Sequence, residues 1–143
     1  MERGQSPYCG YRALSAEGAR HSSLWHRHRS RPLPLKCECY RVGGTDDHVH
    51  LAIRIHRTVC VSDLVEALKT GSSKWIKGEA PHLATFSWQR GYGAFSLRVS
   101  ELNPILEYVD NQAEHHRERS FQDEYRALLR EQGIAIDERY VWD

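Results

Sequence analysis

Two histidines separated by one residue, His48 and His50, are the side chains whose spacing points most directly to chemistry. They open the segment His48–Ile55, whose strict alternation predicts a β-strand with two unlike faces. One face is apolar and is expected to be buried. On the other face the two imidazoles lie roughly 7 Å apart along the strand, close enough to bind one metal ion together. Arg54 shares that face and is placed to meet a phosphate group.

A second pair of polar residues, Tyr108 and Gln112, stands four residues apart, so both lie on one face of a helix. Asn103–Pro104 predicts the start of this helix, which we expect to run to about His116. On its own, a tyrosine and a glutamine at this spacing fit an ordinary helix interface equally well. The Tyr108–Gln112 pair becomes a candidate for a functional site because the His48–His50 pair precedes it. His115 and His116 suit the helix dipole, and we expect both to be exposed rather than to bind metal.

Composition places the chain among small globular proteins and excludes several functions. Its 143 residues, 40% hydrophobic and 27% charged, are enough for one core. No apolar run reaches membrane-spanning length and no secretory leader is recognisable, so we expect a cytoplasmic protein without a membrane partner. A net charge of +1 means that any DNA binding must rest on a local basic face or on a metal. The sequence contains no nucleophile elbow, phosphate loop or dinucleotide fingerprint.

The pattern of elements changes near residue 36. Residues 1–35 show little periodicity, and we expect a flexible or non-native N-terminal segment there. Its basic stretch 26–34 carries two prolines that disfavour a helix, and is either a mobile arm or a tail that grips nucleic acid. Residues 36–143 alternate regularly in the order strand, strand, helix, strand, strand, helix, helix. This order predicts an α+β fold with an antiparallel sheet and helices packed on one face.

Turn and capping residues set the expected boundaries. Ser62 is the expected N-cap of the first helix, and the last helix is expected to begin at Ser120 and to end at Gly133. A glycine-rich turn separates the first two strands, and Gly91–Gly93 is expected to join a second hairpin. The four expected strands are Cys37–Val42, His48–Ile55, Thr85–Gln89 and Ala94–Val99.

The motifs His48–His50 and Tyr108–Gln112 together resemble the single-tyrosine transposases of the HUH endonuclease superfamily, the insertion-sequence-200-like and REP-associated enzymes. The resemblance covers about residues 36–143, which it identifies as the transposase domain, and implies a ferredoxin-like or RRM-like sheet. The family's first strand lies centrally in that sheet. Because no strand is convincing before Cys37, the sequence leaves open whether this chain lacks that strand. Further matching motifs are Arg41–Gly44, Asp47–Leu51, Ser72–Lys77, Phe86–Gln89, Gly91–Ser96, Asn111–His116, Ser120–Gln122 and Asp137–Asp143.

The resemblance also implies a reaction. His48, His50 and Gln112 would hold a divalent metal, magnesium or manganese, and Tyr108 would attack a DNA phosphodiester. The product would be a covalent 5′-phosphotyrosine with a free 3′-hydroxyl, from which the strands are rejoined. The implied activity is that of a DNA transposase acting on single-stranded, hairpin-forming DNA, and the implied assembly is a homodimer.

Several basic and aromatic residues are candidates for DNA contacts, although solvated charges and core aromatics explain each of them equally well. The expected phosphate contacts are Arg54, Lys69, Lys74, Lys77, Arg90 and Arg98. The expected base-stacking residues are Trp75, Trp88 and Tyr92.

Two other functions stay open. The pair Cys37 and Cys39 precedes His48 and His50, which offers four ligands for a small zinc-stabilised binding module, although the spacing is not that of the usual zinc fingers. Alternatively, the chain keeps the transposase fold without the reaction, as a relic that binds hairpin DNA but does not cut it.

Overall fold

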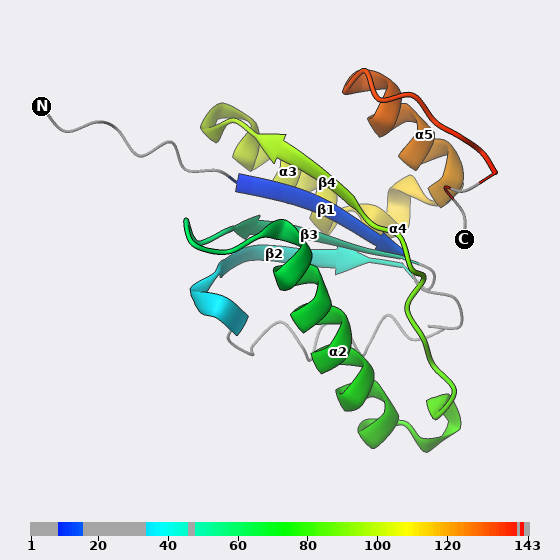
Figure 1. Cartoon of the computed structure of the whole chain (residues 1–143). Helices are drawn as coiled ribbons and strands as arrows, with labels where there is room; N and C mark the ends of the chain where they lie inside the picture. Colours follow the sequence, from blue (N-terminus) through cyan, green and yellow to red (C-terminus); the bar gives the residue numbers. More distant parts are fainter. Residues whose placement is uncertain (1–8, 16–33, 46–47, 140, 142–143) are drawn as a thin grey trace, which may run out of the picture.

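The computed structural model describes residues 9–15, 34–45, 48–139 and 141, and shows an α+β fold built on a four-stranded antiparallel sheet (Figure 1). The strand order is β2-β3-β1-β4. The strands are β1 (Cys9–Ser15), β2 (Glu38–Gly44), β3 (His48–Arg54) and β4 (Gly93–Leu97). The predicted α+β class and its antiparallel sheet are thereby confirmed.

Strand β1 answers the question that the sequence left open, because a strand does precede Cys37 and the sheet contains its first strand. It lies centrally, with Cys9 opposite both Arg54 of β3 and Leu97 of β4. The segment contains glycine, alanine and serine, which are weak strand formers, so local propensity does not reveal it. Pairing on both sides satisfies its backbone groups, and this tertiary context decides the conformation. The basic stretch predicted as an arm lies, except for Pro34, outside the described residues.

The second hairpin expected from the sequence does not form. Thr85–Gln89 is irregular, and β4 pairs with β1 instead of with this segment. Side chains explain the difference: Phe86 is buried in the core, and the indole N–H of Trp88 donates to Oγ of Ser72 at 2.9 Å. The segment is therefore anchored to a helix through its side chains rather than to the sheet through its backbone.

Helices cover both faces of the sheet, whereas the sequence predicted them on one (Figure 1). The apolar face of β3 packs against α2 (Val61–Glu79), in a core that includes Leu51, Leu64 and Ile76. A smaller core on the opposite face joins Phe95 to Val109 and Leu129. The helical elements on that side are η3 (Val99–Glu101), α3 (Leu102–Asp110), α4 (Gln112–His115) and α5 (Phe121–Glu131). The short turns η1 (Pro34–Lys36) and η2 (Pro81–Leu83) precede β2 and follow α2.

Local sequence accounts for most helix boundaries. Ser120 caps α5 as predicted, since its Oγ accepts the backbone N–H of Asp123 at 3.2 Å, and Gly133 follows the helix end with a φ of +67°. Helix α2 begins one residue before Ser62, after Cys60. The single helix expected to reach about His116 is divided at Asn111 into α3 and α4. Among the described residues, no helix is long and apolar enough to cross a membrane.

Candidate active site

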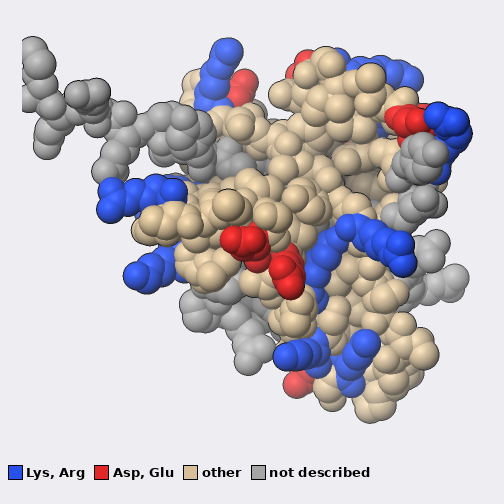
Figure 2. Space-filling view, in the orientation of Figure 1, with Lys and Arg blue, Asp and Glu red and all other residues tan. Residues whose placement is uncertain are grey.

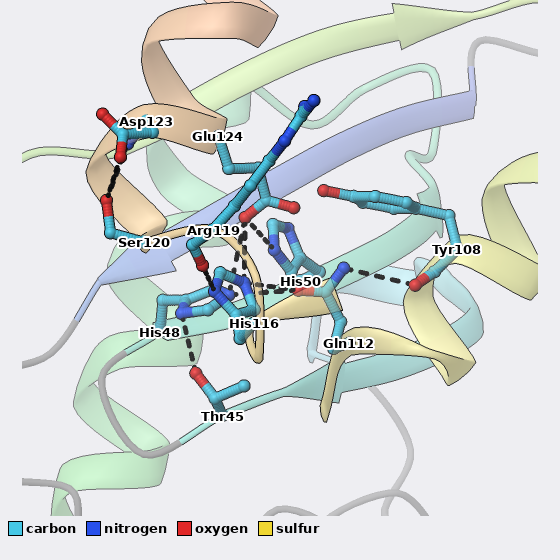
Figure 3. A network of polar contacts seen from close by, with 10 residues as sticks. All are labelled: Thr45, His48, His50, Tyr108, Gln112, His116, Arg119, Ser120, Asp123 and Glu124. Atoms are coloured by element: carbon cyan, nitrogen blue, oxygen red, sulfur yellow. Dashed lines mark hydrogen bonds and ion pairs between the residues drawn. The ribbon is translucent and has the colours of Figure 1, made fainter. Parts of the chain in front are cut away.

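Five polar side chains from four segments meet on the face of the sheet that carries α3, α4 and α5 (Figure 3). Strand β3 supplies His48 and His50, α4 supplies Gln112, the turn after α4 supplies His116, and α5 supplies Glu124. The exposed fractions are 1% for His48, 0% for His50, 1% for Gln112 and 9% for Glu124. Burial on this scale is costly for polar groups, so their mutual contacts must compensate for lost water.

One oxygen of Glu124, Oε2, lies where the three histidine rings converge. The Nε2 atoms of His116, His50 and His48 lie 3.1, 3.4 and 3.8 Å from it. The ligand-capable atoms of these four residues all lie within 4.8 Å of one another. The other carboxylate oxygen, Oε1, is buried and accepts no hydrogen bond from the described residues.

The amide of Gln112 is oriented by the backbone of the preceding helix. Its Nε2 donates to the carbonyl of Tyr108 at 3.2 Å, which assigns the opposite atom, Oε1, to the histidine cluster. That oxygen lies 3.1 Å from Nε2 of His48 and 3.2 Å from Nε2 of His116. Gln112 therefore adds an oxygen donor to the same point.

Contacts at the Nδ1 side of the His48 and His116 rings set the direction in which the Nε2 atoms point. Nδ1 of His116 donates to the backbone carbonyl of Arg119 at 2.9 Å, so the neutral ring carries its lone pair on Nε2. Nδ1 of His48 lies 3.0 Å from Oγ1 of Thr45, and the ring of Phe121 stacks on His48 at 4.4 Å. Both rings consequently aim Nε2 at the carboxylate.

Burial lowers the pKa of His50 below its ordinary value, mainly by desolvation, and this effect outweighs the interaction with the accepting Glu124 carboxylate, which raises the pKa. The neutral imidazole is the form that binds metals. Three ring nitrogens, a carboxylate oxygen and an amide oxygen facing one point form a donor set for a divalent cation. The residues present thus fit the metal that the resemblance implies.

Tyr108 lies beside this cluster rather than in it. Its half-buried ring is 5.8 Å from that of His50 and 5.0 Å from that of His115, measured between ring centroids. Figure 3 shows its hydroxyl end turned toward the side of the cluster where Glu124 lies. The tyrosine and the candidate metal ligands therefore lie next to one another within a single chain.

The structure brings together the three residues expected from the sequence to bind metal, and adds two further residues with potential ligand atoms, His116 and Glu124, that were missed. His115 is exposed, as expected, but His116 is half-buried and in the cluster, so that part of the expectation is wrong. A signal was present, because His116 stands four residues after Gln112, on the same helical face. Glu124 carries no comparable signal, because its approach depends on how α5 packs.

Comparison with known proteins decides the family. The profile of the family described as "Transposase IS200 like" matches residues 11–112, from β1 to Gln112. This chain belongs to the IS200-like transposases. The fold is shared with the crystal structure, at 1.90 Å, of a candidate transposase from Deinococcus radiodurans R1. That match has a TM-score of 0.54 and 23% identity, and covers 78% of this chain and 98% of the other. No curated protein matched.

In this IS200-like transposase the expected DNA-contacting residues lie outside the histidine cluster. Lys74, Lys77, Arg90 and Arg98 are exposed. On the face drawn in Figure 2, lysine and arginine side chains form separate groups rather than one continuous patch. Arg54, also exposed, makes an ion pair with Glu38 at 2.5 Å, so its guanidinium is partly engaged within the sheet.

Like Arg54, four others of the expected DNA-contacting residues have structural partners: Lys69, Trp75, Trp88 and Tyr92. Nζ of Lys69 donates to the backbone carbonyls of Gln89, Arg90 and Gly91 at 2.6, 3.2 and 2.9 Å. Trp75 and Trp88 are half-buried and pack against the core formed by α2 and β3. Tyr92 is an exposed aromatic ring, and Nζ of Lys69 lies over it, 5.9 Å from the ring centroid. Which of these residues touches DNA stays a prediction.

In this transposase Cys37 and Cys39 lie on the other side of the sheet from the histidines. Cys37 is buried in the core beneath α2, where its Sγ accepts the backbone N–H of His56 at 3.4 Å. Cys39 packs against the same core. Within the described part of the chain, neither thiol joins the cluster around His48 and His50, so the four-ligand site of the zinc-module alternative is not formed.

Proposed function

We propose that this chain is a metal-dependent single-tyrosine DNA transposase that cleaves and rejoins single-stranded DNA. His48, His50 and Gln112 would hold a magnesium or manganese ion, and Tyr108 would be the nucleophile. The observation that carries the proposal is the convergence of the two β3 imidazoles and the Gln112 oxygen beside Tyr108, in a chain of the IS200-like family.

The metal would supply Lewis-acid polarisation and orientation of the scissile phosphate. The phenolic oxygen of Tyr108 forms a bond to phosphorus, and the bond from phosphorus to the 3′-oxygen breaks, leaving a 5′-phosphotyrosine and a 3′-hydroxyl. The phenol, whose pKa is about 10 in a free tyrosine, loses its proton in this step, and the departing 3′-oxygen gains one, so the step consumes and releases no net proton. In the reverse direction a 3′-hydroxyl attacks the phosphotyrosine, and the phenoxide departs. The bond energy is conserved for rejoining, so no external energy source is needed.

The substrate we propose is a single strand folded into a hairpin, handled by a homodimer in the cytoplasm. The exposed residues Lys74, Lys77, Arg90 and Arg98 would contact phosphates, and Tyr92 is the exposed ring best suited to base stacking. Because the net charge is only +1, these contacts must act locally.

A second candidate keeps the fold and the DNA but not the reaction: a relic that binds hairpins without cutting them. It is favoured if Tyr108 cannot reach the phosphate, since the tyrosine ring lies beside the metal-ligating cluster rather than in contact with its ligand atoms. The two candidates differ in one observable product, the covalent protein–DNA adduct.

The test is a denaturing gel with labelled single-stranded hairpin DNA and either manganese or magnesium. We compare the native chain with Tyr108→Phe, and with Tyr40→Phe in β2 as the matched control on a half-buried tyrosine outside the proposed site. An adduct that survives denaturation, disappears in Tyr108→Phe and persists in Tyr40→Phe supports the transposase. An adduct that persists in Tyr108→Phe refutes the assigned nucleophile. A folded protein that binds the hairpin without any adduct supports the binding relic instead.

A further inference from the structure

We propose that His116 and Glu124 complete the metal centre, so that three imidazole nitrogens and two oxygens bind one divalent transition ion and fasten α5 to the sheet. This inference rests on the proposed centre at His48, His50 and Gln112, and extends it with two residues that follow the stretch matched by the family profile.

The orientation of His116 is that of a metal ligand. Its Nδ1 is engaged by the carbonyl of Arg119, so in the neutral ring the lone pair on Nε2 faces inward. Nε2 lies 3.2 Å from Oε1 of Gln112 and 3.1 Å from Oε2 of Glu124, both of which are acceptors. A hydrogen-bonded outer nitrogen that holds the ring and its tautomer is the usual arrangement behind a ligating histidine.

Glu124 is a carboxylate turned inward from α5. It is 9% exposed, and its Oε2 lies within 3.8 Å of all three Nε2 atoms. The remaining oxygen, Oε1, finds no hydrogen-bond donor among the described residues. Burying a carboxylate costs several kcal/mol unless a cation or several donors offset it, on the order given for buried ions in real proteins. A divalent ion among the five donors supplies that compensation.

Protons offer the rival explanation, because an imidazolium on His116 would also pair with Glu124. In that arrangement the amide oxygen of Gln112 would accept hydrogen bonds from the N–H groups of the histidine rings. The two explanations predict opposite results for a metal titration. If protons alone hold the cluster, removing the carboxylate does not change metal affinity; if Glu124 is a ligand, it does.

The donor set selects the class of ion. Magnesium prefers an octahedron of oxygens and keeps several waters, whereas imidazole nitrogen suits manganese, cobalt and zinc. With three imidazoles converging, we expect the native chain to bind Mn²⁺ more tightly than Mg²⁺. A centre that held only His48, His50 and Gln112 would discriminate less between the two ions.

Because of where the two added ligands lie in the chain, a bound ion would hold α5 against the sheet. His116 stands in the turn between α4 and α5, and Glu124 lies in the first turn of α5, one turn after Phe121, which stacks on His48. An ion held at once by β3 and by α5 would therefore resist separation of the helix from the sheet. Metal binding should slow amide hydrogen exchange in α5.

The experiment measures Mn²⁺ binding to the full chain, by electron paramagnetic resonance of free Mn²⁺, together with hydrogen exchange in α5. The variants are Glu124→Gln and His116→Gln, and the matched controls are the exposed neighbours Glu131→Gln and His115→Gln. Loss of an outer-shell partner already weakens metal binding about 10- to 100-fold, so loss of a direct ligand should cost at least about tenfold. The controls should bind as the native chain does.

Each outcome bears on one proposal or on both. Weaker binding in both variants, with protection of α5 by Mn²⁺ in the native chain but not in Glu124→Gln, supports the five-donor centre. Native affinity in folded Glu124→Gln and His116→Gln overturns this inference and leaves the three-residue centre standing. If the native chain itself binds neither Mn²⁺ nor Mg²⁺, the metal-dependent function fails together with the inference.

Discussion

The backbone of Gly43 in β2 lies directly against Val109 in α3: a Cβ atom on Gly43 would stand 2.1 Å from the Val109 carbonyl oxygen. Val109 follows Tyr108, so this close contact sets the distance between the sheet and α3, the helix that carries Tyr108. An ion pair between Arg41 and Asp110, with Nε and Oδ1 3.4 Å apart, reinforces the same contact. The glycine is required here by space, since any side chain would push against backbone rather than against a flexible group.

Gly43→Ala should therefore displace α3 and destabilise the protein. Overpacking of a close contact typically costs about 1–3 kcal/mol in the free energy of unfolding, measurable by urea denaturation. Because Tyr108 and Gln112 move with the helix, adduct formation should fall as well. The matched control is Gly71→Ala, at an exposed helical position with nothing within 4 Å of the added Cβ. It should stabilise the protein by about 0.5–1 kcal/mol. A Gly43→Ala protein as stable and as active as the native chain would contradict the packing argument.

Elements whose signals are local could be predicted from the sequence. The alternation of β3 gave both its strand and its two faces, and the capping of α5 by Ser120 followed from one serine. Such features depend on residues a few positions apart, so no knowledge of the tertiary structure is needed.

Elements that depend on distant partners could not be predicted. Strand β1 is made by pairing with β3 and β4 on its two sides, and nothing in its own composition requires that conformation. Conversely, Thr85–Gln89 has strand-like residues but is held by the contact from Trp88 to Ser72 in α2. In both cases tertiary contacts override local preference.

The candidate site divides in the same way. His48 and His50 are spaced by one strand period and Gln112 by one helical turn from Tyr108, and these spacings together with the family resemblance identified them as candidates. His116 and Glu124 come from a turn and from α5, whose approach to β3 is set by packing around Phe121 and Leu129. Sequence spacing does not encode that approach.

Ser120→Ala should weaken both α5 and the metal centre. The Ser120 hydroxyl accepts the Asp123 backbone N–H at 3.2 Å, and loss of an N-cap costs about 1 kcal/mol. Since Glu124 follows Asp123 in the first turn, fraying there should also lower Mn²⁺ affinity. Ser62→Ala serves as control, because Ser62 is exposed and lies after the N-cap of α2. Thermal denaturation with and without Mn²⁺ measures both effects; equal losses in the two variants would remove the link between cap and site.

Lys69→Met and Lys74→Met should separate a structural lysine from a DNA-binding one. Lys69 holds three carbonyls of the segment 89–91, and hydrogen bonds from a charged group contribute about 1.5–3 kcal/mol, with the lower end expected for a half-exposed ammonium. Its loss should lower stability. Lys74 is exposed, and its loss should leave stability unchanged but reduce the salt dependence of hairpin binding by about 0.7 in log–log slope per phosphate contact. A destabilised Lys74→Met protein, or an unchanged salt slope, would count against this division.

Cys39→Ser should leave metal binding unchanged. The half-buried Cys39 packs against the core beneath α2, and its Sγ is 3.5 Å from the carbonyl of Arg41, across the sheet from the histidines. Zn²⁺ and Mn²⁺ titrations of this variant test the point. If the native chain binds one equivalent of Zn²⁺ and Cys39→Ser does not, the result would instead support the zinc-stabilised binding module.

Removing the metal should lower the melting temperature by an amount that the affinity itself fixes. An ion that binds only the folded chain stabilises it by about 2.7 kcal/mol when present at one hundred times its dissociation constant. Adding excess chelator should abolish that gain, and the melting temperature should return to its metal-free value. In Glu124→Gln the same Mn²⁺ concentration should produce a smaller gain, because each tenfold loss of affinity removes about 1.4 kcal/mol. A chelator effect identical in the native chain and in Glu124→Gln would mean that α5 contributes nothing to the site, whereas a smaller one ties the helix to the ion.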